Sequence, residues 1–102
     1  MPYKLTPWRE EAAATEDLLR QKLGADGFKV SSWSKNAGEG MDEQEQAFTR
    51  AFACVKGMLR VNLPGDNDYA DLLPGDRVEL PPGTKHSVMV GPAGVTCLEG
   101  QK

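Results

Sequence analysis

The sequence contains no long apolar run, no cluster of basic residues and only one histidine among its 102 residues. A membrane-spanning helix needs about 20 consecutive apolar residues, so none is expected. The first ten residues are too polar to resemble a signal peptide. The formal charge is −3, and with no Lys/Arg cluster neither nucleic acid nor an anionic membrane is an expected partner. We therefore expect a cytoplasmic protein.

Cysteine is scarce as well. The only two, Cys54 and Cys97, lie far apart and form no CxxC pair. Free cysteines in a reducing compartment behave mostly as small buried apolar residues. We predict two buried thiols, with a disulfide or redox role as the alternative.

The composition that remains, 39% apolar and 26% charged, is typical of one globular domain. Thr15 is suited to cap a helix, acidic residues follow it, and Leu18, Leu19 and Leu23 form an apolar stripe at helical spacing. Gly24 suits the position after the last turn. We predict an N-terminal extension over residues 1–27 that contains this helix, followed by a second part over residues 28–102.

From residue 28 onward, short apolar segments alternate with turn sequences rich in Gly, Pro, Asn and Asp. This rhythm, with no helix between the segments, indicates an antiparallel sandwich or barrel. The predicted strands are Phe28 to Trp33, Ala47 to Val55, Met58 to Leu63, Arg77 to Leu80, His86 to Val90 and Val95 to Leu98. The predicted turns include Lys56-Gly57 and Gly91-Pro92.

A strand pattern from residue 43 to residue 55 divides its side chains between two faces. Both faces become apolar toward the end, which predicts a strand covered by the barrel interior on one side and by another element or subunit on the other. One face carries Gln44, Gln46, Phe48, Arg50, Phe52 and Cys54, and the other begins with Glu43 and Glu45.

The segment that ends in the single histidine resembles the second conserved motif of the cupin superfamily. Gly75, Pro81, Gly83 and His86 stand at its anchor positions, and Val90 stands where the family often has asparagine. The physical logic is a turn into one strand, then a second tight turn into the strand that carries the histidine. In cupins this histidine points into the barrel.

The first cupin motif keeps its spacing between Gly38 and Gly57. Gln44 and Gln46 stand at its two histidine positions and Arg50 at its glutamate position, so all three motif ligands differ. The resemblance is greatest to small single-domain bacterial cupins, many of which have no defined activity. It implies an all-β, cupin-type double-stranded β-helix (jelly-roll) barrel with a short N-terminal helix.

Cupins typically hold Fe, Mn, Ni or Zn through three histidines and one glutamate. A glutamine oxygen is a weak ligand, and the guanidinium of Arg50 cannot coordinate because it is permanently protonated. We therefore expect no cofactor. A register shift by one residue is the weak alternative, because it would bring Glu43, Glu45 and His86 together around a divalent metal.

Three hypotheses for the function follow. The first is a metal-free binding module for a small polar or anionic metabolite. The second is an enzyme, either metal-dependent like a dioxygenase or isomerase with an atypical ligand set, or a metal-free acid/base catalyst that uses His86. The third is a structural or partner-binding barrel without a ligand. The ligand site of the first hypothesis comprises Gln44, Gln46, Phe48, Arg50, Phe52 and His86.

Other interpretations of these residues stay open. Arg50 can pair with a carboxylate inside the barrel and bind nothing, and Phe48 and Phe52 can be core residues. Small cupins commonly pair through the outer faces of their sheets, so the resemblance also implies a homodimer.

Overall fold

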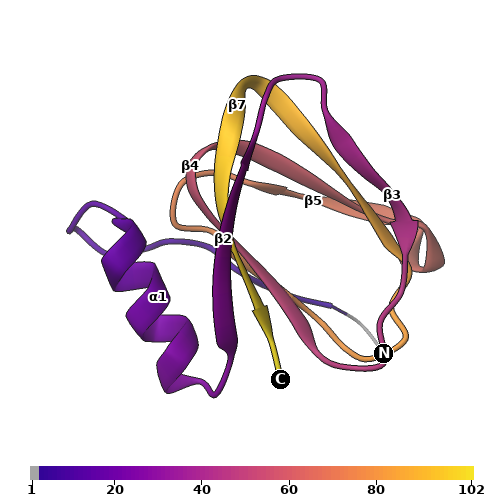
Figure 1. The fold of residues 1–102 in the computed structure, drawn as a ribbon, viewed down its shortest axis with the longest axis horizontal. Coiled ribbons are helices and arrows are strands. Elements are labelled where there is room, and N and C mark those ends of the chain that lie inside the picture. Colours follow the sequence, from indigo (N-terminus) through magenta and orange to yellow (C-terminus); the bar gives the residue numbers. More distant parts are fainter. Residues whose placement is uncertain (1–2) are drawn as a thin grey trace.

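The computed structural model describes residues 3–102, which form one helix packed against a bent antiparallel sheet (Figure 1). The elements in chain order are β1 (Lys4–Thr6), α1 (Glu16–Ala25), β2 (Lys29–Lys35), β3 (Gly40–Gln44), β4 (Arg50–Leu63), a 3₁₀ turn (Pro64–Asp66), β5 (Asp68–Leu72), β6 (Arg77–Leu80) and β7 (His86–Gln101). The expected all-β jelly-roll class with one N-terminal helix is confirmed.

The long strands β4 and β7 run through both layers of the fold. The first part of β4 pairs with β6 and with the last part of β7, and β1 and β2 complete that layer at its edges. The second part of β4 pairs with β5 and with the first part of β7, whose other neighbour is β3. The sheet thus folds back on itself and encloses a core between its two layers.

Two predicted turns, Lys56-Gly57 and Gly91-Pro92, are wrong, because the chain stays in strand at both places. The pairing of β4 with β7 shifts register between Cys54 and Lys56 and again between Gly57 and Leu59, as at a β-bulge. Gly57 has a φ of +86°, and a Cβ there would collide with the carbonyl oxygen of Gly94. A bulge that only glycine tolerates lets the strand bend instead of ending.

The predicted continuous strand from residue 43 to residue 55 is also wrong. β3 ends at Gln44 and pairs with the first part of β7. β4 begins only at Arg50, and its first residues pair with β6 and with the last part of β7. The backbone N–H of Gly83 donates to the carbonyl oxygen of Gln46 at 2.7 Å, which ties down the segment between the two strands.

The predicted helix is confirmed, with Thr15 as its cap, but Gly24 lies inside its last turn rather than after it, because α1 continues to Ala25. The Thr15 hydroxyl accepts a hydrogen bond from the N–H of Leu18 at 3.2 Å. The buried face of α1 packs on the outer side of the sheet. This second core cluster consists of Leu19, Leu23, Phe28, Ala51, Ala53 and Leu98.

This packing explains the strand that is apolar on both faces. The chain's own helix covers the outer side of Ala51 and Ala53, so no second subunit is needed there. The strand that is apolar on both faces therefore no longer supports a homodimer. The homodimer stays a prediction. No helix within residues 3–102 is long and apolar enough to cross a membrane.

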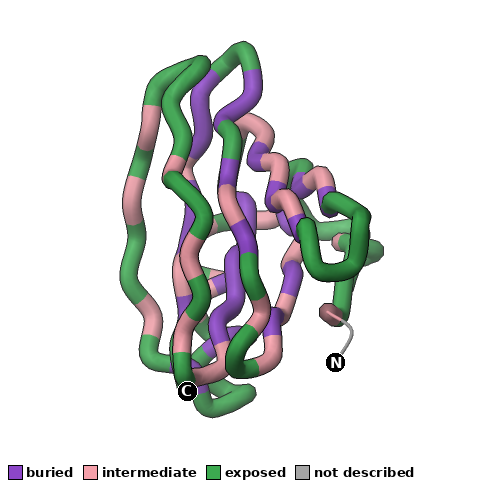
Figure 2. Tube along the Cα trace, turned by 90° about the vertical axis from the view of Figure 1, so that its right-hand side faces the viewer, coloured by how far each residue is buried: buried purple, intermediate pink, exposed green. Residues whose placement is uncertain are grey.

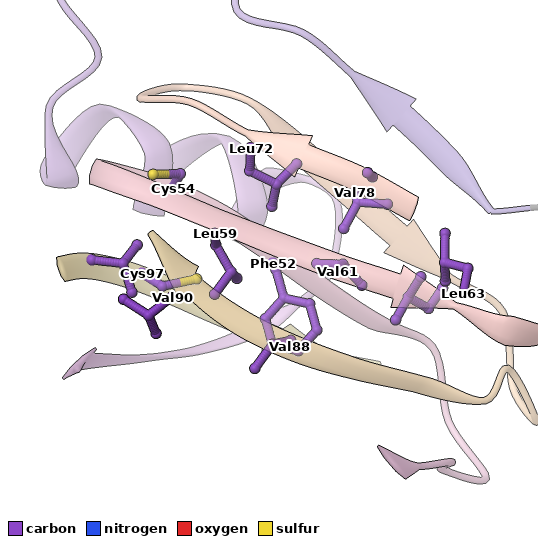
Figure 3. Packing of buried hydrophobic residues seen from close by; sticks show 13 residues of the cluster. Phe52, Cys54, Leu59, Val61, Leu63, Leu72, Val78, Val88, Val90 and Cys97 are labelled. Carbon is purple, nitrogen blue, oxygen red and sulfur yellow. The ribbon is translucent and has the colours of Figure 1, made fainter. Parts of the chain in front are cut away.

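The main core lies between the two layers of the sheet. Figure 2 shows the buried stretches along the strands and the exposed residues at the loops. Side chains from β4 and β7 face one another across this space, with Phe52 the largest fully buried side chain (Figure 3). Cys54 and Cys97 belong to this core as free, buried cysteines, as predicted.

Candidate functional site

Two of the predicted site residues meet inside the barrel. Arg50 is the first residue of β4 and His86 is the first residue of β7. Arg50 Nη1 lies 3.4 Å from His86 Nε2. Arg50 is 9% exposed and His86 only 1%, so both polar groups are buried. The geometry places a fixed positive charge beside the single imidazole.

The contacts of His86 define its tautomer. Nδ1 lies 2.9 Å from the carbonyl oxygen of Thr84, which can only accept, so Nδ1 carries the hydrogen. Nε2 then presents its lone pair to the Arg50 guanidinium. Burial lowers the pKa of His86 below its usual 6.5, and the charge of Arg50 lowers it further. The Thr84 carbonyl and Glu99 oppose this shift.

This shift predicts a pH dependence of stability. Because the folded pKa of His86 lies below the usual 6.5, the unfolded chain binds more protons between these two values. The contribution of His86 is thus fully present above about pH 6.5 and is lost as the pH falls toward the folded pKa. We expect the free energy of unfolding, measured in urea from pH 7.5 to pH 5, to fall more steeply for the wild type than for His86→Gln, by at most about 1.4 kcal/mol per pH unit. Equal slopes would contradict the buried, neutral imidazole.

Glu99 is the site residue that the sequence did not reveal. Its Oε2 lies 3.4 Å from Arg50 Nη2, and its Oε1 accepts a hydrogen bond from Trp33 Nε1 at 3.2 Å. Arg50 therefore pairs with a carboxylate inside the barrel, as one interpretation predicted, whereas its prediction that Arg50 binds no ligand stays a prediction. Cys97 and Glu99 lie two positions apart on β7 and so share a face. Alternation continued from the buried Cys97 would have placed Glu99 inward.

The two aromatic candidates differ in position. Phe52 is fully buried and packs edge-on against Trp33 and His86, with ring centroids 6.4 and 5.9 Å away. Phe48 is half-buried, and its ring centroid lies 5.5 Å from Arg50 Cζ. Phe52 is thus a core residue that forms the wall behind Arg50, while Phe48 lies toward the surface.

Gln44 and Gln46 lie nearer the rim of the site. Both are half-buried, and Gln44 stands opposite His86 in the β3–β7 pairing. Gln46 Nε2 donates to Gln44 Oε1 at 3.1 Å. The neighbouring Glu43 and Glu45 are exposed. The structure therefore joins Arg50 to His86 and places the two glutamines beside them.

These residues do not fit a metal ion. The lone pair of His86 Nε2 faces the Arg50 guanidinium, and the oxygen of Gln44 accepts from Gln46. Within residues 3–102, no three His, Cys, Asp or Glu side chains are grouped so that they could hold a metal. The alternative set of Glu43, Glu45 and His86 is not brought together.

Arg50 retains unused hydrogen-bonding capacity. A guanidinium has five N–H donors, and both of its polar contacts, to His86 and Glu99, are 3.4 Å long. Charge-assisted bonds normally measure about 2.7–2.9 Å. Arg50 Nε is buried and has no hydrogen-bond partner in the described part of the chain. Arg50 therefore keeps donor capacity that no residue in the described part of the chain uses.

Comparison with solved structures identifies proteins that have a similar fold. An RmlC-like cupin from Shewanella frigidimarina matches with a TM-score of 0.63 and 20% identity, over 72% of this chain and 64% of that chain. A cupin superfamily protein from Desulfitobacterium hafniense matches with a TM-score of 0.65 and 16% identity, over 98% and 76%. The DMSP lyase DddQ from Ruegeria pomeroyi matches with a TM-score of 0.67 and 18% identity, over 76% and 39%.

The chain therefore spans less than two thirds of the Shewanella cupin and about two fifths of the lyase. No protein-family model matches the sequence, and no curated protein matches it. Its likeness to the solved structures, together with its own bent antiparallel sheet, shows that this chain has the double-stranded β-helix fold of the small cupins.

Proposed function

We propose that this protein binds a small polar or anionic metabolite at the end of the barrel where Arg50 and His86 lie, without a resident metal. The observation that carries the proposal is the buried guanidinium of Arg50, whose Nε has no partner and whose other contacts are long. An unsatisfied buried donor costs about 1–3 kcal/mol. Because Nε is shielded from solvent, a ligand oxygen would bind to the η nitrogens, whose present contacts are long.

The charges around Arg50 define the ligand further. Glu99 compensates the positive charge and His86 is neutral, so the site holds a donor and an acceptor side by side. Such a pair suits a molecule that carries a carbonyl or carboxylate oxygen for Arg50 and a hydroxyl group for Glu99. Gln44, which stands opposite His86, and Phe48, whose ring centroid lies 5.5 Å from Arg50 Cζ, are the half-buried residues next to this pair.

A thermal-shift screen of small hydroxy acids, simple carboxylic acids and sugar phosphates tests this proposal. A ligand at ten times its Kd stabilises the folded state by about 1.4 kcal/mol, or roughly 5–10 °C for a domain of this size. We expect the variant Arg50→Gln/Glu99→Gln to lose this shift, because it removes the guanidinium without leaving a buried carboxylate unpaired.

Arg60→Gln is the matched control. Arg60 is also a strand arginine in an ion pair, with Asp71 at 2.7 Å, but it is more exposed. Its replacement should leave the ligand-induced shift unchanged. A shift that persists in the Arg50→Gln/Glu99→Gln variant, or a screen in which no compound stabilises the wild type, would contradict the proposed site.

Proton transfer by His86 is the second candidate function. It is favoured by the lone pair of Nε2, which faces the same guanidinium to which the ligand oxygen would bind. The similar structures include a DMSP lyase, so the fold supports catalysis in that protein. If the site is catalytic, His86→Gln should keep ligand binding and lose turnover.

A further inference from the structure

The two cysteines of the chain lie directly opposite each other on the two longest strands of the fold. Cys54 and Cys97 are register partners in the antiparallel pairing of β4 with β7. Directly opposite residues point to the same face of a sheet, and here both belong to the main core (Figure 3). Both cysteines are free and fully buried. The topology therefore brings together two thiols that lie far apart in the sequence.

The backbone bonds of Cys54 show which kind of cross-strand pair this is. Its N–H donates to the carbonyl oxygen of Asp76 at 3.0 Å, and its carbonyl oxygen accepts from the N–H of Gly75 at 2.7 Å, so both groups serve the segment that leads into β6. The mutual bonds between Thr49 and Lys102 fit the same alternation along β4 and β7. The pair is therefore non-hydrogen-bonded, and the Cα atoms of such pairs lie about 4.5 Å apart. A disulfide spans Cα distances of about 4.4–6.8 Å.

The side chains need only a small adjustment to join. Cys54 Sγ donates to the carbonyl oxygen of Gly57 at 3.6 Å, and Cys97 Sγ donates to that of Leu98 at 3.3 Å. A thiol is a weak donor, so little is lost when each Sγ rotates toward the other. The Cβ atoms of opposite residues lie about 4.5–5.5 Å apart, against about 3.8 Å in a disulfide. The register shift directly after Cys54 interrupts the ladder where the strands must approach.

The closed fold shields both thiols from oxidants. Burial raises the pKa of Cys54 to about 11 and also raises the pKa of Cys97. The thiolate is the reactive form, so neither cysteine reacts readily at neutral pH once the chain is folded. In the unfolded chain both thiols are exposed to solvent. The structure thus favours a bond that forms during folding, when the developing β4–β7 pairing brings the two sulfur atoms together.

We propose that Cys54 and Cys97 form a disulfide bond across β4 and β7 when the chain folds in the presence of a low-molecular-weight disulfide such as oxidised glutathione. One cysteine thiolate attacks the glutathione disulfide, which forms a mixed disulfide and releases one glutathione. The other cysteine thiolate attacks the protein sulfur of the mixed disulfide and releases the second glutathione. Two electrons and two protons pass from the protein thiols to the oxidant. This bond does not depend on the function proposed above.

The test refolds the reduced, urea-unfolded protein in an excess of oxidised glutathione and, in parallel, in a reductant. Free thiols are then alkylated and counted by intact-mass spectrometry, and the Tm of each sample is measured. We expect most of the oxidised sample to carry neither alkyl groups nor glutathione. Because the bond closes a loop of about 40 residues, this sample should unfold about 10–15 °C above the reduced one. Protein that is already folded should stay reduced in the same oxidant over the same time.

The matched control is the variant Cys54→Ala/Val55→Cys, which moves one thiol by a single position. Val55 is half-buried and packs against the second core cluster, on the opposite face of β4. The chain still has two thiols at nearly the same separation in sequence. We expect this variant to form no internal disulfide and to gain no thermal stability in the oxidant.

Three results would overturn the proposal: the wild type refolds with its two cysteines unlinked, the linked form unfolds at or below the Tm of the reduced form, or the control variant links as readily as the wild type. The first two comparisons need only the wild-type protein, so they remain decisive if the control variant does not fold.

Discussion

Replacement of Glu99 by leucine is expected to lower the free energy of unfolding by about 2–3 kcal/mol. The change leaves the guanidinium of Arg50 buried without a carboxylate and removes the acceptor of Trp33 Nε1. Loss of one partner of a buried ion pair costs about 3–5 kcal/mol. We expect somewhat less here because the Glu99 side chain is 20% exposed. Urea denaturation at pH 7 measures the effect.

The double variant Arg50→Met/Glu99→Leu separates the ion pair from simple packing. Replacing both partners by apolar side chains leaves no buried charge, so the stability should return to within about 1 kcal/mol of the wild type. Glu43→Leu, which removes an exposed carboxylate from β3, should change stability by less than about 0.5 kcal/mol. If the double variant is as unstable as Glu99→Leu, the loss of stability does not come from an unpaired Arg50, and the account of the Arg50–Glu99 ion pair is contradicted.

Phe52→Ala is expected to have the largest effect on stability, a loss of about 3–5 kcal/mol. Phe52 is fully buried and packs against Trp33 and His86, so its removal leaves a cavity in the centre of the main core. The same change removes the wall behind Arg50. Because the stability of a domain of this size is about 5–15 kcal/mol, the variant should remain folded only at low temperature or low denaturant.

Phe48→Ala is the matched control for this prediction. The two rings lie at similar distances from Arg50 Cζ, 5.5 Å for Phe48 and 5.7 Å for Phe52, but Phe48 is only half-buried. Its removal should cost less than half as much stability and should still weaken ligand binding. Equal losses of stability in the two variants would contradict the assignment of Phe52 to the core and of Phe48 to a position toward the surface.

The fold could be predicted because its signals are local. The turn glycines and prolines around β6 predict a tight turn on each side of a short strand, and β6 occupies the predicted Arg77–Leu80. Thr15 with the acidic residues after it predicts the start of α1 for the same reason. In each case a few neighbouring residues determine the backbone conformation by themselves.

The errors arise where distant segments decide the structure. Gly57 was expected in a turn, yet it lies in a β-bulge. The reason is that β7 pairs with β4 both before and after Gly57, so the strand continues. Glu99 could not be assigned as the partner of Arg50, because the two lie on different strands and their contact depends on the β4–β7 register. The apolar outer side of Ala53 likewise had two explanations until the position of α1 decided between them.

The measurement that tests the central claim most directly is ¹⁵N NMR of the His86 side chain during a Zn²⁺ titration at pH 7. By its resemblance to the first cupin motif, Arg50 stands at the position of a metal-binding glutamate, and the lone pair of His86 Nε2 faces its guanidinium. The account predicts a protonated Nδ1, an unprotonated Nε2 and no specific change of either signal at one equivalent of Zn²⁺. A large shift of Nε2 at one equivalent, absent after Gln44→Ala or Glu43→Ala, would show a metal site and contradict the account.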